Sequence, residues 1–109
     1  MEKDRVYIQH ILDAISTIEN FLKDKDEKSF RKNKLLQDGL MRELEVIGEA
    51  AKKLSENFKI SVPQIPWKSI TGMRDKIIHD YFSVDLDAIW KTATEDISYL
   101  KRELYRSRE

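Results

Sequence analysis

The sequence contains no cysteine, which excludes disulfide bridges, thiol catalysis and cysteine-ligated metal sites. Glycine and proline are scarce, at three and two of 109 residues. Because both residues interrupt helices, their scarcity in a chain rich in Lys, Glu, Leu and Ile indicates a mostly helical protein. No apolar run approaches the roughly 20 residues of a membrane span. We therefore expect a single cytoplasmic domain covering residues 1–109, with no membrane partner.

The chain also lacks a net charge, because 20 basic side chains are matched by 20 acidic ones. No overall field attracts nucleic acid, so RNA binding would need a local basic patch. KSFRKNK (residues 28–34) groups four basic side chains, and KRELYR (101–106) adds more. Either segment could line an RNA approach path through salt-dependent phosphate contacts. Solvated helix surface is the favoured interpretation of both.

Apolar residues recur at spacings of three and four, which is typical of amphipathic helices. We expect one helix over roughly residues 3–24 and a second over about 29–58. SVPQIPW then forms a connector, and Pro66 can open the third helix because proline suits a first helical turn. A fourth helix follows, capped by Ser83 or Asp85. The predicted fold class is all-α, a four- to five-helix up-and-down bundle with short connections.

The second helical segment contains the run IGEAA around Gly48, and Gly39 lies earlier in the same pattern. Each glycine costs a helix interior about 1 kcal/mol relative to alanine. Small residues of this kind let another helix backbone approach closely. Two interpretations stay open: tight packing within the chain, or contact with a second copy that completes the apolar burial of a small domain.

The stretch MRDKIIHDY (residues 73–81) gathers side chains capable of phosphate chemistry. Arg74 can hold phosphate oxygens with two parallel hydrogen bonds, and His79 can exchange protons near neutral pH. Tyr81 offers a hydroxyl, and Asp75 offers a carboxylate. An arginine and a histidine can suffice for RNA cleavage without a metal. The histidine would manage the proton of the 2′-hydroxyl or of the leaving 5′-oxygen, while the arginine would stabilise charge growing on the phosphate.

The spacing of this motif presents a geometric difficulty. Five residues of an ideal helix turn about 500°, which leaves Arg74 and His79 roughly 140° apart around the axis. Either the helix ends or distorts near His79, or the site is assembled between two protomers. One histidine with scattered acidic residues is poor evidence for a metal site, so none is predicted. Arg-x4-His alone arises often by chance, and the other histidine, His10, is assigned to the surface or to packing.

A wider pattern surrounds the motif. RELEVIGEAAKKLSE precedes VPQIPWKSITGMRDKIIHDYFSVDLDAIW, so that IGEAA, PW, Arg-x4-His-x-Tyr and VDLDAIW follow one another in that order. This set resembles the HepT family of small HEPN-domain toxins. The resemblance covers nearly the whole chain, from DRVYIQHILDAI to TATEDISYL. The combination is specific, whereas the Arg-x4-His fragment is not.

The resemblance implies a homodimeric HEPN domain whose two Arg-x4-His motifs line a shared cleft. Carried over by position, Arg74 and His79 would be catalytic in a metal-independent endoribonuclease that acts on an RNA, such as a tRNA or an mRNA, and needs no cofactor. Asp75 holds a position that is typically polar in the family and would orient one of them, although its carboxylate also lowers the local positive potential.

The resemblance also implies a partner. The chain would be the toxin of a type VII-like HepT–MntA toxin–antitoxin module. An MntA-like minimal nucleotidyltransferase would act as the antitoxin by transferring AMP from ATP onto Tyr81.

Two interpretations from other classes compete with the toxin ribonuclease. The first is a non-catalytic HEPN binding module that docks a nucleotidyltransferase, which the zero net charge favours slightly. The second is a purely structural helical dimer, which the extent of the resemblance disfavours. RNA degradation in the presence of EDTA, with a His79→Ala control, distinguishes the enzyme from the binding module.

Overall fold

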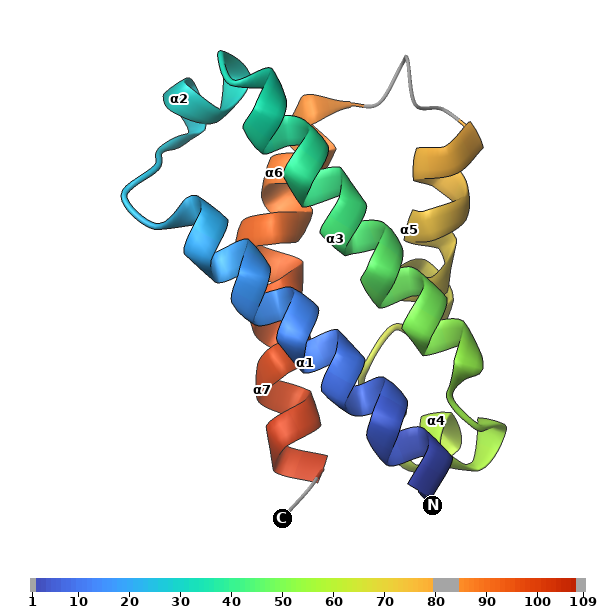
Figure 1. Ribbon diagram of the computed structural model, residues 1–109. Helices are drawn as coiled ribbons and strands as arrows, with labels where there is room; N and C mark the ends of the chain where they lie inside the picture. Colours follow the sequence, from blue (N-terminus) through green and yellow to red (C-terminus); the bar gives the residue numbers. More distant parts are fainter. Residues whose placement is uncertain (1, 80–84, 108–109) are drawn as a thin grey trace.

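The computed structural model describes residues 2–79 and 85–107, and for Glu2, Arg74 and residues 76–79 it describes the backbone alone. The described chain consists of α-helices and one π-helical turn joined by short connectors, and it contains no strand (Figure 1). The predicted all-α class is therefore confirmed. No helix within these two ranges is both long and apolar enough to cross a membrane.

Helix α1 (Glu2–Leu22) confirms the first predicted helix, with its end two residues earlier than expected. Asp24 has a φ of 60°, a left-handed conformation that ends the helix. The buried face of α1 packs against α3 (Lys34–Lys53), the central helix of the bundle. The face consists of apolar residues at helical spacing: Ile8, Ile11, Leu12, Ile15 and Ile18.

The single second helix predicted over about 29–58 is wrong, because three helices occupy this segment. They are α2 (Glu27–Arg31), α3 and α4 (Glu56–Ser61). The side chains of Asp26, Asn33 and Ser55 each accept a hydrogen bond from the backbone N–H of the third residue of the helix that follows, and so cap its first turn. The helical spacing of apolar residues continues across these caps, so the apolar pattern alone does not indicate where one helix ends and the next begins.

The run IGEAA lies inside the single chain. Gly48, Ala50 and Ala51 are all buried on α3, which packs against both α1 and α5 (Trp67–His79). The small side chains thus serve close packing within the chain. Gly39 has a similar role, since a Cβ placed there would lie 3.0 Å from the Phe21 ring of α1.

Helix α5 begins directly after the proline-containing connector. The Pro66 carbonyl accepts the first helical hydrogen bond, from the Ile70 N–H, so proline stands one residue before the helix. The Trp67 indole N–H donates to the Val62 carbonyl at 3.1 Å and closes the connector on itself. Ile70 is buried, and Trp67 and Met73 pack against the core, which agrees with their three-residue spacing along one helical face.

The last predicted helix is continuous but not uniform. It consists of α6 (Leu86–Lys91), the π-helical turn η2 (Thr92–Asp96) and α7 (Ile97–Ser107), and the Asp85 side chain caps its start. Ile89, Ala93 and Ile97 are buried although each is four residues from the next. The rod therefore keeps one apolar face toward the core through the π turn.

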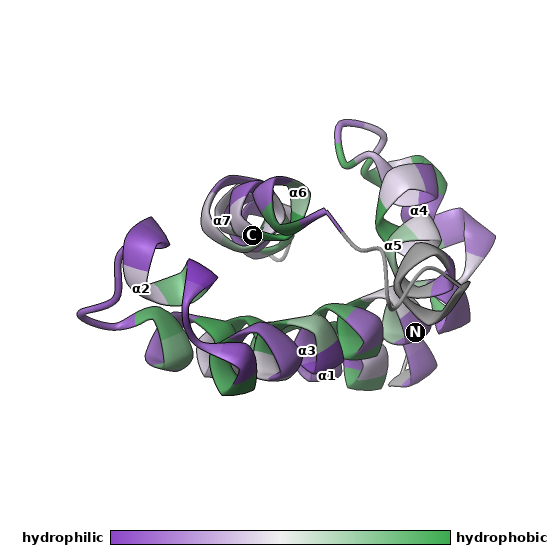
Figure 2. Cartoon of the chain, turned by 90° about the horizontal axis from the view of Figure 1, so that it is seen from above, coloured by the Kyte–Doolittle hydropathy of each residue, from purple (hydrophilic) through white to green (hydrophobic). Residues whose placement is uncertain are grey.

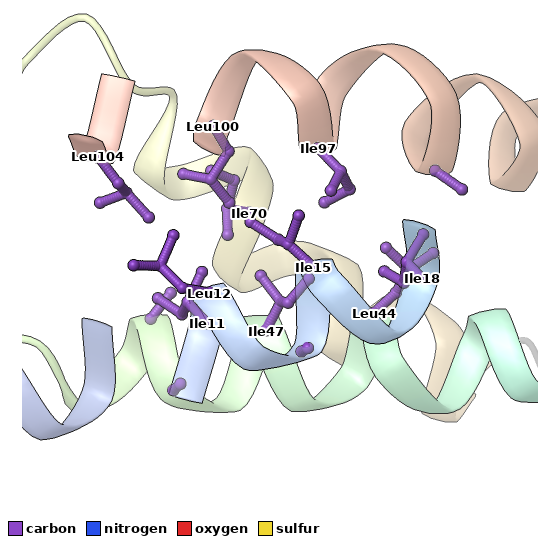
Figure 3. Packing of buried hydrophobic residues seen from close by; sticks show 14 of the residues in the cluster. Ile11, Leu12, Ile15, Ile18, Leu44, Ile47, Ile70, Ile97, Leu100 and Leu104 are labelled. Atoms are coloured by element: carbon purple, nitrogen blue, oxygen red, sulfur yellow. The ribbon is translucent and has the colours of Figure 1, made fainter. Parts of the chain in front are cut away.

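The helices form two layers. Figure 2 shows α1 and α3 side by side in one layer, with α5 and the α6–α7 rod standing apart on top of it. Figure 3 shows the apolar side chains that join the layers, with Ile97 and Leu100 of α7 above Ile15 of α1 and Ile47 of α3.

Two buried carboxylates connect separate elements. Asp4 accepts hydrogen bonds from the backbone N–H and the hydroxyl of Ser55, both at 2.7 Å. Burial acts to raise the pKa of Asp4, but the two hydrogen bonds outweigh it and hold the pKa below its usual value. The Gln64 amide donates to Glu103 and lowers the pKa of that carboxyl, with help from Arg106 and despite burial.

Candidate functional site

The motif residues lie on one unbroken helix. Arg74 and His79 both belong to α5, which is α-helical from Trp67 to His79. The backbone between the two positions is regular α-helix. Ideal helix geometry therefore keeps them about 140° apart around the axis. The described part of α5 ends at His79, so both solutions offered by the sequence stay open: a helix end near His79, or a site assembled between two protomers.

Asp75 is the motif residue whose side chain is described. Its Oδ1 lies 2.8 Å from Nζ of Lys52, which comes from α3. The two side chains are 47% and 36% exposed, so water screens the pair and its contribution to stability is below about 1 kcal/mol. Its electrostatic effect is more relevant, because Lys52 offsets the negative charge that Asp75 brings next to Arg74. His79 follows Asp75 by four residues, on the same helical face.

Lys52 could not have been selected from the sequence. It lies in the run AAKKLSE, 23 residues before Asp75, and nothing in its neighbourhood indicates a functional role. Only the packing of α3 against α5 brings the two charges together. The sequence does indicate which face of its helix Lys52 occupies. It does not indicate which other helix packs against that face, so the partner of Lys52 cannot be inferred from it.

Tyr81, the predicted modification site, lies outside the described residues, as does Ser83. Asp85 is the first described residue after this gap, and its side chain accepts a hydrogen bond from the Asp87 N–H at 2.9 Å. Of the two predicted caps for the last helix, Asp85 is the one that performs this role.

The two basic segments lie at opposite ends of the bundle. Helix α2 lies at the same end as the carboxyl end of α5, whereas the end of α7 lies at the other (Figure 1). In the α2 segment Arg31 pairs with Glu27 and Asp87, and Lys34 pairs with Asp38 at 2.6 Å. Lys28 and Lys32 are exposed. Part of this segment therefore belongs to ordinary helix surface.

His10 lies on α1, whereas the motif lies on α5. It is exposed, and its ring meets the edge of Tyr7 at a centroid distance of 5.7 Å. Of the two assignments made from the sequence, surface or packing in the core, the structure confirms the surface. Among the side chains that the structure describes, no three His, Asp or Glu residues are grouped as ligands for a metal ion.

Comparison with known proteins places this architecture in a family. Residues 11–106 match the family described as ribonuclease HepT-like. No solved structure matches the chain significantly. The match covers most of the chain and includes α5, and we conclude that the chain belongs to the HepT-like ribonuclease family.

Three relatives illustrate the similarity. A Methanocaldococcus jannaschii protein named "Gamma-glutamylcyclotransferase and putative RNase" is 44% identical over the whole chain, which spans half of that protein. A "Putative RNase" of the same organism is 42% identical over 91% of the chain and 85% of its own length. A "Probable ribonuclease HepT" of Thermococcus cleftensis is 42% identical over 94% of both chains.

Proposed function

We propose that this chain is a metal-independent endoribonuclease and the toxin of a HepT–MntA-type module. The observation that carries the proposal is the placement of Arg74 and His79 on one regular helix of a HepT-like chain. The names of the relatives, which include RNase or ribonuclease in each case, support the class of reaction.

In the proposed reaction, the RNA 2′-hydroxyl attacks the adjacent phosphorus, and the bond to the leaving 5′-oxygen breaks. His79 takes the hydroxyl proton or supplies one to the leaving oxygen. Arg74 holds the phosphate and stabilises the charge that develops on its oxygens. The products are a 2′,3′-cyclic phosphate and a free 5′-hydroxyl, so the atoms and the protons balance without a cofactor.

The helical geometry argues for a homodimeric site. Two positions about 140° apart on one helix do not face a common phosphate. Two copies of α5 related by a two-fold axis can present Arg74 from one copy and His79 from the other to the same cleft. Asp75 would orient this arrangement while Lys52 offsets its charge.

Control by an MntA-like nucleotidyltransferase would act through Tyr81. AMP transferred from ATP onto the Tyr81 hydroxyl, with release of pyrophosphate, adds a bulky anion two residues after His79. That anion would occupy the position of the RNA phosphate and pair with Arg74. The groups that bind substrate would then hold the modification in place.

The ribonuclease is tested with purified protein and total RNA in EDTA. Wild type should degrade the RNA, and His79→Ala and Arg74→Ala should lose this activity while keeping their helical content. Equal degradation by all three proteins would identify a contaminating nuclease. An inactive wild type that still binds a nucleotidyltransferase would favour the second candidate, a HEPN binding module, which the zero net charge supports.

The modification is tested separately with Tyr81→Phe. This variant keeps the ring but lacks the hydroxyl, so it should remain active when the nucleotidyltransferase and ATP are added, whereas wild type should be silenced. Mass spectrometry should find the added AMP on wild type alone. Complete silencing of Tyr81→Phe would refute control through this tyrosine.

A further inference from the structure

A groove separates α5 from the α6–α7 rod. Figure 2 shows these two elements standing apart on the α1–α3 layer, and a cavity of about 410 Å³ lies between them. Leu44 of α3 forms part of its floor, and Ile70 and Met73 of α5 form part of one wall. Ile89 and Leu100 line the opposite wall, on the rod.

The chemistry of the lining is unusual for a chain with 20 basic residues. None of the described residues that line the cavity is Lys, Arg or His. The charged members are Asp85 and Asp96, both carboxylates, and hydroxyls come from residues such as Ser69 and Thr92. The charged groups of the described lining are therefore carboxylates, with the Lys91 ammonium beside one of them, and an apolar body with a positive charge complements this lining.

Both carboxylates retain capacity to accept hydrogen bonds. Asp85 accepts one from the Asp87 N–H, and Asp96 meets the Lys91 ammonium at 3.5 Å with its side chain 54% exposed. An ionised carboxylate has about four lone-pair sites, so one such contact leaves room for a ligand donor.

Two features of the walls favour a ligand. Gly72 lines the cavity, and a Cβ built on it would meet no atom within 4 Å. Glycine in a helix interior costs about 1 kcal/mol relative to alanine, and nothing in the described chain uses the space it leaves. The facing wall includes Thr92 and Asp96 of the π turn η2, and π turns occur frequently at functional sites.

We propose that this groove binds a small amine whose apolar body lies against Ile70, Met73 and Ile89 and whose ammonium is held by a rim carboxylate. The volume lies within the range of small-molecule sites, about 300–1,000 Å³. The inference does not depend on ribonuclease activity.

Binding is tested with phenethylamine as the probe, alongside phenethyl alcohol and phenylpropionate, which carry the same ring with a neutral or a negative group. Amide NMR shifts of the wild-type chain should move saturably with phenethylamine, with a Kd on the order of 1 mM or tighter. The shifts should centre on Gly72 and Thr92. The alcohol should bind about tenfold more weakly, and the acid more weakly still.

Variants of the walls assign the site. Gly72→Leu should fill the cavity and abolish the shifts, whereas Thr71→Leu, on the same helix but outside the lining, should leave them intact. Asp85→Asn with Asp96→Asn should remove the preference for amine over alcohol. The helix start should survive this change, because asparagine caps a helix about as well as aspartate.

Three outcomes would overturn the proposal: no saturable shift in wild type, undiminished binding by Gly72→Leu, or equal binding of acid and amine. Shifts at Gly72 and Thr92 that depend on protein concentration, without ligand binding, would mean that a second copy fills the groove and would also overturn it.

Discussion

Gly39 and Gly72 both lie in helix interiors, but their surroundings differ. A Cβ at position 39 would lie 3.0 Å from Phe21, whereas one at position 72 would meet open space. Neither glycine has a positive φ. At position 72, nothing within the described chain therefore opposes a side chain.

The same substitution should consequently have different effects at these two positions. We expect Gly72→Ala to raise the free energy of unfolding by about 0.5–1 kcal/mol, because alanine restricts the unfolded backbone and favours the helix. Gly39→Ala should gain less or destabilise, since the Phe21 ring must move. Urea unfolding of the two variants beside wild type measures the difference. Equal gains would show that Phe21 yields at no cost.

At the scale of elements, part of the fold follows from the sequence alone. The spacing of Ile11, Ile15 and Ile18 predicts α1, and that of Trp67, Ile70 and Met73 predicts the inward face of α5. The breaks on either side of α3 were missed, because the caps at Asn33 and Ser55 interrupt the backbone without interrupting the apolar pattern. The π turn was missed because its residues read as ordinary helix.

The candidate site was predictable to a similar extent. The sequence places Arg74, Asp75 and His79 on one helix, and the structure confirms that placement. The Lys52 partner of Asp75 depends on how α3 and α5 pack across 23 residues, which local patterns do not encode. The roles of Arg74, His79 and Tyr81 stay predictions.

The link between α1 and α4 gives a pH prediction at this scale. Asp4 has a lowered pKa because Ser55 hydrogen bonds outweigh burial, so its stabilising effect is present above the unfolded value of 3.8 and is lost as pH falls through the folded pKa. Asp4→Asn should therefore be less stable than wild type at pH 7, and the difference should shrink below about pH 4. Urea unfolding at several pH values measures it. A difference that stays constant down to about pH 2 would contradict the assignment.

At the scale of the whole molecule, the two ends of the bundle differ. The α2 end lies with the carboxyl end of α5, and the chain's N-terminus lies at the other end of α1 (Figure 1), about 30 Å away along that helix. Figure 2 shows α2 and α5 on opposite sides of the α6–α7 rod, and we propose that exposed lysines of α2 contact RNA that extends from the motif across this end.

Removing two of them should weaken RNA binding in a salt-dependent manner. We expect Lys28→Ala with Lys32→Ala, in a His79→Ala background, to reduce the slope of log affinity against log salt by about 1 to 2. The matched control, Lys3→Ala with Arg5→Ala, removes the same charge at the opposite end and should leave the slope unchanged. Filter binding to single-stranded RNA measures both. Equal losses in the two double variants would mean that net charge, rather than the α2 surface, governs binding.

The whole account depends on a site shared by two copies of α5. Arg74 and His79 lie about 140° apart on one regular helix, and we propose on this ground that each active cleft takes its arginine and its histidine from different protomers. A protomer that lacks Arg74 and a protomer that lacks His79 should then rebuild one complete site between them.

The most direct measurement is RNA cleavage in EDTA by a mixture of Arg74→Ala and His79→Ala proteins, unfolded together and refolded. Each variant alone should be inactive. The mixture should recover about a quarter of wild-type activity, because half of the dimers are mixed and each mixed dimer has one of its two sites intact. A mixture as inactive as its parents, beside an active wild type, would place both residues in one protomer and contradict the shared site.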